Sequence, residues 1–149
     1  MAIARRRIDL AEGRAALAAW QAAVGQQAGQ AAVGQQAGQE AGQEAGQETV
    51  PGTPPSRTVL ATAVRYSLEE LTARAPGNSV EVRVPPFGVT QCVEGPRHTR
   101  GTPPNVIECD AATWLAMVTG RLAWSDAVDA GRVAASGLRA DLSELLPLL

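Results

Sequence analysis

A low-complexity tract divides the chain into a short and a long part. Residues Ala22–Gln30 read AAVGQQAGQ, and the next nine residues repeat them without change before two EAGQ units follow. Repeats that build a fold carry an apolar face that stacks on the next repeat, and these units offer only alanine and a single valine. With glycine every few residues, burial does not offset the entropy of ordering the chain. We therefore expect a disordered Gln/Gly/Ala linker at 25–55, with a Gln-rich self-association segment as the alternative.

The charge balance excludes nucleic acid as a partner. All thirteen basic residues are arginine, and the net charge is −2. Three of the fifteen carboxylates, Glu40, Glu44 and Glu48, lie in the tract, so the remainder is close to neutral and has no strong field to attract a polyanion. No integral membrane segment is expected, whereas peripheral membrane contact and the oligomeric state stay open.

The N-terminus and the cysteines indicate a cytoplasmic protein without a metal or other cofactor. Arg5-Arg6-Arg7 is followed at once by Asp9 and other charged residues, which a secretory signal does not tolerate. Cys92 and Cys109 are seventeen residues apart with no CxxC pattern, so they are not zinc ligands. We expect buried, reduced, inert thiols on neighbouring strands.

Helical patterns flank the tract. Asp9 with Glu12 forms a capping box for a helix in residues 1–24, whose apolar stripe is Leu10, Leu17, Trp20 and Val24. Pro54-Pro55-Ser56 begins a second helix that stops at Pro76-Gly77. Its apolar set is Val59, Leu60, Ala63, Val64, Leu68 and Leu71.

The pattern then changes to the period of a strand. Ser79–Val84 alternates strictly, and Phe87–Val93 supplies a second strand with Phe87, Val89 and Val93 on one side. The pair predicts an antiparallel hairpin with one buried face. Asn105–Cys109 is predicted to be a short third strand.

The C-terminal part adds two helices, a strand and a turn. Asp110 caps a helix over 111–119, Ser125 caps a short helix through residue 130, and a strand follows at Arg132–Ser136. An amphipathic turn over Asp141–Leu146 places leucines at i, i+3, i+4 and i+7, namely Leu142, Leu145, Leu146 and Leu149. These elements predict an α/β (α+β) domain at 56–149, with helices on one face of a small, mostly antiparallel sheet.

Several motifs resemble the sterol carrier protein family. Asp110–Gly120, Trp124–Val128 and Gly131-Arg-Val133 resemble the C-terminal half of that family. Ala75–Gly88 and Gly95–Asn105 look like its short bacterial branch seen in actinobacteria. The resemblance implies a sterol-carrier-like five-stranded sheet, helices over one face, an apolar tunnel for a lipid, and no catalytic residues.

The leading hypothesis is therefore non-catalytic binding, and transfer, of a lipid or other apolar ligand. The alternative is a protein-interaction or scaffold module with the same fold and a filled core, because a leucine or tryptophan stripe serves equally to fill a core. The residues expected to line an apolar pocket are Val82, Val84, Phe87, Val89, Trp114, Leu115, Val118, Leu142, Leu145 and Leu146.

The loop from Gly95 to Asn105 supplies candidates for an anion or headgroup site. Arg97, His98 and Arg100 lie among glycines that free the backbone, although the arginines could equally pair with acidic side chains of neighbouring strands. The loop lacks the order of a nucleotide-binding P-loop. His98 has no nucleophile pattern beside it, so we expect that the protein is not an enzyme.

Overall fold

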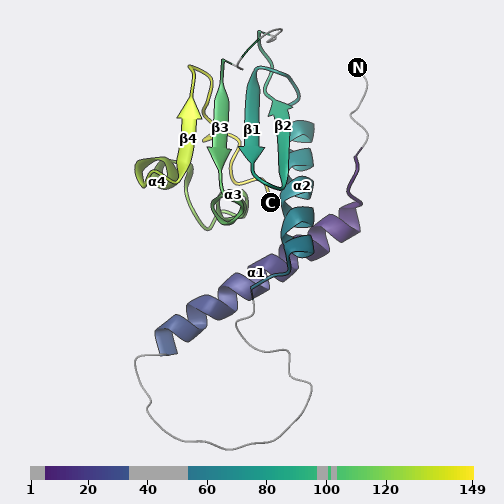
Figure 1. Ribbon diagram of the computed structural model, residues 1–149, viewed down its shortest axis with the longest axis vertical. Coiled ribbons are helices and arrows are strands. Elements are labelled where there is room, and N and C mark those ends of the chain that lie inside the picture. The colour runs from purple at the N-terminus through teal and green to yellow at the C-terminus, as the bar shows by residue number, and fades with distance from the viewer. Residues whose placement is uncertain (1–5, 34–53, 97–100, 102–103) are drawn as a thin grey trace, which may run out of the picture.

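The chain forms a mixed sheet with helices packed against one face (Figure 1). The computed structural model describes residues 6–33, 54–96, 101 and 104–149. In these ranges the strands are β1 (Val80–Val84), β2 (Gly88–Cys92), β3 (Val106–Cys109) and β4 (Val133–Ser136), in the order β2-β1-β3-β4. The predicted α/β class is confirmed.

The direction of the strands differs from the expectation. β1 pairs antiparallel with β2 and parallel with β3, and β3 pairs antiparallel with β4. The sheet of the described residues is thus four-stranded and mixed, and neither five strands nor a mostly antiparallel sheet is confirmed. The long connection after β2 carries the chain back to the far side of β1, so β3 enters in the same direction as β1.

Asn105 holds the entry to β3 in place. Its amide nitrogen donates to the Ser79 carbonyl at 2.8 Å, and its amide oxygen accepts from the Arg139 N–H at 2.9 Å. Gly137 passes so close that a Cβ atom there would overlap the Pro104 carbonyl, and its φ of +101° suits glycine. One buried side chain thus joins the starts of β1 and β3 to the segment after β4.

Helix α1 (Leu10–Val33) packs against α2 (Arg57–Arg74). The Asp9 carboxylate accepts from the backbone N–H groups of Ala11 and Glu12, which confirms the predicted N-terminus. Leu17 and Trp20 are buried, while Leu10 is 41% exposed and lies off the predicted stripe.

Helix α1 continues to Val33, where irregular chain was expected from residue 25. Alanine and glutamine favour helix strongly enough to carry it through Gly25 and Gly29 once its first half is docked. Residues 34–53 of the predicted linker lie outside the described residues.

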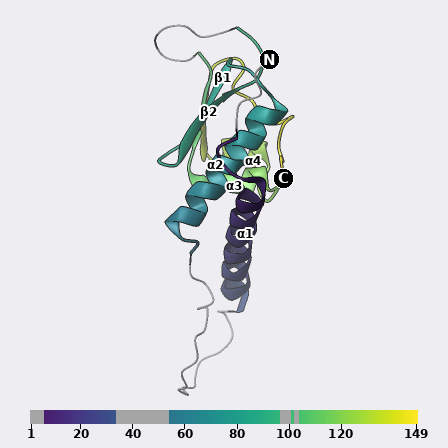
Figure 2. The same ribbon diagram turned by 90° about the vertical axis from the view of Figure 1, so that its right-hand side faces the viewer.

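Helix α2 matches its prediction closely. The Ser56 hydroxyl accepts from the Val59 N–H at 3.2 Å, and the helix ends just before Pro76. It buries Tyr66 and Ser67 as well as most of the predicted apolar set, namely Ala63, Val64, Leu68 and Leu71. Figure 2 shows α2 and α3 on one side of the sheet and no described helix on the other.

The remaining elements complete the covered face. Asp110 caps α3 (Ala111–Val118) through the Thr113 N–H at 2.8 Å, as expected. Helix α4 (Trp124–Asp129) begins before Ser125, so the predicted Ser125 cap is wrong: Ala123 is the N-cap and makes no side-chain hydrogen bond.

The C-terminal segment ends in a single turn. The N–H groups of Leu145 and Leu146 donate to the Leu142 carbonyl. The N–H groups of Leu148 and Leu149 then donate to the Val118 carbonyl. Leu142 and Leu148 are buried, whereas Leu149 is 43% exposed. No helix in the described ranges is both long and apolar enough to cross a bilayer.

The contact between α1 and α2 depends on Gly13. A Cβ atom at this position would overlap the Tyr66 ring, whereas one at Gly29 in the same helix would meet nothing within 4 Å. We expect Gly13→Ala to lower the free energy of unfolding by about 1–3 kcal/mol because the helices must separate. The control, Gly29→Ala, should raise it by about 0.5–1 kcal/mol. Urea denaturation measures both; a Gly13→Ala protein as stable as the parent would contradict this helix contact.

Candidate functional site

Most of the residues expected to line an internal pocket belong to a filled core or pack against its edge. Six of them have no exposed surface: Val82, Val84, Trp114, Leu115, Val118 and Leu142. They belong to one cluster with the buried side chains of α1 and α2, and Phe87, Leu145 and Leu146 pack against its edge. None of the six lines either of the two hollows described below.

A buried hydrogen bond fixes the packing between α2 and α3. The Trp114 indole N–H donates to the Ser67 hydroxyl at 2.8 Å, and that hydroxyl donates to the Val64 carbonyl at 2.8 Å. Both side chains are fully buried. An indole placed in this way satisfies its only donor inside the core, so it has no polar atom left for a ligand.

Val89 lies on the opposite face of the sheet from the one predicted. Val89 pairs with Arg83, whereas the buried Val82 pairs with Thr90. Val89 is 61% exposed. Two residues lie opposite Val84: its carbonyl accepts the Phe87 N–H, and Gly88 is its partner in the strand pairing. The hairpin therefore contains one extra residue just before β2 begins, as in a β-bulge. That extra residue shifts the alternation, so Val89 does not form part of the inner apolar wall.

An open groove lies outside the core, between α2, the edge strand β2 and the segment Arg6–Ile8. Its volume is about 1520 Å³. We call it the α2–β2 groove. Its lining comprises Arg6, Arg7, Ile8, Arg65, Leu68, Glu69, Thr72, Ala73, Pro76, Gly77, Asn78, Phe87, Gly88, Val89, Thr90 and Gln91.

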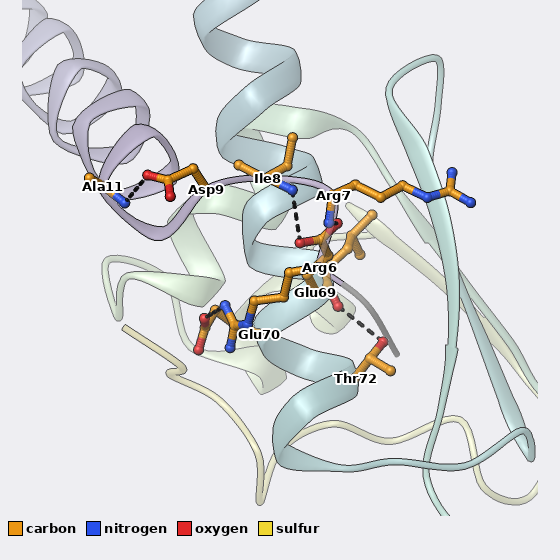
Figure 3. Close-up of polar contacts among 9 residues, drawn as sticks. Arg6, Arg7, Ile8, Asp9, Ala11, Glu69, Glu70 and Thr72 are labelled. Carbon is orange, nitrogen blue, oxygen red and sulfur yellow. Dashed lines mark hydrogen bonds and ion pairs between the residues drawn. The ribbon is translucent and has the colours of Figure 1, made fainter. Parts of the chain in front are cut away.

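Two glutamates of α2 fasten the N-terminal wall of the groove (Figure 3). The Glu69 carboxylate accepts the backbone N–H of Arg7 at 2.9 Å and that of Ile8 at 3.3 Å. Arg6 forms an ion pair with Glu70. The hydrogen bond that the Arg6 guanidinium donates to Glu70 raises the pKa of Arg6, against the opposing effect of its slight burial.

Side chains of α2 also cover part of the free edge of β2. The Arg65 Nε donates to the Phe87 carbonyl at 2.9 Å, and the Thr72 hydroxyl hydrogen bonds to the Thr90 hydroxyl at 2.8 Å. In an antiparallel pair, successive residues direct their backbone N–H and carbonyl groups alternately toward and away from the partner strand. In β2 the odd-numbered residues direct these groups away from β1. Val89, between the two contacts, therefore presents its backbone N–H and carbonyl to the groove.

The second hollow is a shallow depression of about 430 Å³ on the uncovered face of the sheet. Arg83 lies in it, with Nε 2.5 Å from Glu81 and one terminal nitrogen 4.0 Å from Glu108. Two carboxylates and one guanidinium line the depression, so its net charge is −1 and it does not suit an anionic ligand.

Cys92 and Cys109 are free and buried, as expected, but they do not lie on neighbouring strands. β1 separates β2 from β3, so the expectation that the two thiols approach each other is wrong. Burial raises the pKa of Cys92 to about 11. Burial, with the charges of Asp110 and Glu108, raises that of Cys109 to about 12.

The polar candidates of the sequence lie elsewhere. Arg97, His98 and Arg100 are outside the described residues. Among the residues that are described, no three His, Cys, Asp or Glu side chains come together as a metal site. The sequence did not predict three residues of the groove, namely Arg7, Arg65 and Glu69. The one pattern that points toward them is the basic run at the N-terminus, which indicates a charged segment but not its partner.

Comparison with known families identifies the chain. The family model described as "Bacterial SCP ortholog" matches residues 56–148. The chain therefore belongs to the bacterial branch of the sterol carrier protein family, and this membership indicates a lipid or other apolar ligand. No curated protein matches the chain.

Because the core is filled, we expect shortening of the Leu115 side chain to destabilise the protein. Leu115→Ala should lower the free energy of unfolding by about 2–5 kcal/mol, because the truncation leaves a cavity among fully buried neighbours. The fully exposed Leu138 serves as the control, and Leu138→Ala should stay within about 0.5 kcal/mol of the parent. Denaturant titration gives both values. A cost near zero for Leu115→Ala would indicate that this side chain already faces open space.

The raised thiol pKa values predict a loss of stability at high pH. Folding favours the neutral thiols, so their contribution is complete below the ordinary pKa of 9.0 and is lost as the pH rises toward 11 and 12. The free energy of unfolding should therefore fall between pH 8.5 and pH 10.5, and less steeply in a Cys92→Ala, Cys109→Ala double variant. Equal slopes in the two proteins would exclude this role for the thiols.

Proposed function

We propose that the protein binds a lipid or another apolar ligand non-covalently, without catalysing a reaction, and that the ligand lies in the α2–β2 groove. The observation that carries this proposal is the contrast between the filled core and the open groove. A ligand between the sheet and the helices would have to displace side chains with no exposed surface, each of which contributes about 1.5–3 kcal/mol by its burial. The groove accepts a ligand without that cost.

The groove has the composition of a binding surface. Apolar residues from three separate parts of the chain, Ile8, Ala73 and Phe87 among them, line it together with a few polar groups. Ligand sites in proteins are mostly apolar, with a small number of placed polar groups, and commonly measure about 300–1,000 Å³. The described groove is large enough for such a ligand even though one side is open.

The polar groups of the groove support binding rather than catalysis. The Thr72 and Thr90 hydroxyls bond to each other, and both oxygens of Glu69 accept backbone N–H groups. A catalytic pair requires a nucleophile within hydrogen-bond reach of a base. In the described lining, the hydroxyls and the carboxylate are committed to structural hydrogen bonds instead.

The second candidate function is a protein-interaction module with a filled core, and the filled core itself favours it. The two candidates differ in what occupies the groove. A lipid-binding protein retains or takes up a lipid in the absence of any partner protein, whereas an interaction module does not.

The test combines native mass spectrometry with displacement of a fluorescent alkyl probe. The purified protein should carry or take up a lipid. Ala73→Trp, which fills the groove, should weaken probe binding by about tenfold or more, equivalent to about 1.4 kcal/mol. Ala112→Trp, at an exposed position on α3, is the matched control and should bind as the parent does.

Two results would contradict the proposal. If neither fatty acids nor phospholipids bind to the parent protein, lipid binding is excluded and the interaction module remains. If Ala73→Trp and Ala112→Trp bind lipid equally well, the ligand does not lie in the α2–β2 groove.

A further inference from the structure

The charges of the α2–β2 groove are unequal. Three arginines, Arg6, Arg7 and Arg65, face a single acidic residue, Glu69, among the described residues that line it. Glu70 neutralises Arg6 from outside the groove. Both oxygens of Glu69 are already engaged by backbone N–H groups. Arg7 and Arg65 therefore have no ion-pair partner among the described residues, and with Glu69 and Glu70 counted the three arginines leave a net charge of +1.

Arg7 is held by its backbone and not by its side chain. Its N–H donates to Glu69 at 2.9 Å, and Figure 3 shows its side chain extending away from that carboxylate toward the strands. Within the described part of the chain, no hydrogen-bond partner or ion pair engages the Arg7 guanidinium. All five of its N–H donors are therefore free to bind an acceptor.

Arg65 approaches the same region from α2. Its Nε donates to the Phe87 carbonyl at 2.9 Å, which fixes the guanidinium beside the start of β2. Among the described residues, its two terminal nitrogens have no partner. A guanidinium fixed at one nitrogen still offers a planar pair of donors, which is the geometry that carboxylates and phosphates accept.

Apolar surface continues from these arginines. Phe87 is half-buried, with the Arg57 guanidinium 5.7 Å from its ring centroid, and Ile8 is half-buried in the N-terminal segment. Ala73 and Pro76 are exposed on the α2 wall. The groove thus pairs a cationic region with an apolar strip, and a ligand that covers both must be amphipathic.

We propose that Arg7 and Arg65 select a single-chain amphiphile with an anionic head, a carboxylate or a phosphate, over neutral ligands such as alcohols and sterols. The inference rests on the proposed function, because it names the class of ligand for the same groove. The alkyl chain lies along Ile8, Ala73 and Phe87, and the head accepts hydrogen bonds from the two guanidinium groups.

The same charges argue against a second copy of the chain as the occupant. An antiparallel β2–β2 contact would bring Arg7 and Arg65 of one copy close to those of the other. Like charges placed together disfavour association, and an anion relieves this repulsion. Charge complementarity therefore favours an anionic ligand over self-pairing of the β2 edge.

The experiment compares ligands that differ only in the head. Decanoate, decyl phosphate and decanol each compete with the fluorescent alkyl probe at pH 7.5, and inorganic phosphate is the free-anion arm. We expect the two anionic amphiphiles to bind about tenfold or more tightly than decanol, with the preference declining as salt rises. Inorganic phosphate should compete only weakly, because it lacks the chain.

Variants assign the preference to the two arginines. Arg7→Gln and Arg65→Gln should each reduce the affinity for decanoate by a larger factor than the affinity for decanol. Arg65→Lys, which keeps the charge, should retain part of the preference. Arg14→Gln, at an exposed position on α1 outside the groove lining, is the control and should bind all ligands as the parent does.

Three outcomes would overturn the inference while leaving lipid binding intact. They are equal affinities of the parent for decanoate and decanol, a parallel loss of both ligands in the arginine variants, and competition by inorganic phosphate as strong as that by decyl phosphate. If no alkyl ligand binds, whatever its head, the proposed function itself is wrong.

Discussion

The packing of α2 and α3 on the inner face of the sheet is the constraint on which the rest of the structure depends. Trp114 lies at its centre, with its indole N–H bonded to Ser67 and no exposed surface. A core of this kind is packed as densely as an organic crystal, so it does not yield space without a large loss of contacts. Whatever this member of the sterol carrier protein family binds must therefore be accommodated elsewhere, unless the sheet and helices separate.

Space is available where the fold leaves a free strand edge. β2 is at the end of the sheet, and α2 runs beside it, so a helix and an edge strand form two walls of a groove. The third wall is held by Glu69, which accepts two backbone N–H groups of the N-terminal segment, and by the ion pair of Arg6 with Glu70. Glu69 positions Arg7 through its backbone N–H and does not bind its guanidinium. This hydrogen bond therefore helps to determine where a positive charge lies in the groove.

Local patterns predicted the elements, but not the contacts between distant ones. The alternation of Val80, Val82 and Val84 identified the buried face, and Ser56 and Asp110 marked two helix starts correctly. Val89 was placed on the wrong face because the extra residue at the turn is a property of the hairpin geometry and not of the valine spacing. The groove could not be predicted, since Arg7 and Glu69 are 62 residues apart.

The central claim is that ligand binds in the α2–β2 groove and not inside the core. Nuclear Overhauser effects between a bound fatty acid and the methyl groups of the protein test it directly. Contacts from the alkyl chain to the methyl groups of Ala73 and Ile8, with none to Val82, Leu115 or Leu142, are the predicted result. Contacts to those three buried side chains would show that the core opens to receive the ligand, and would contradict the account.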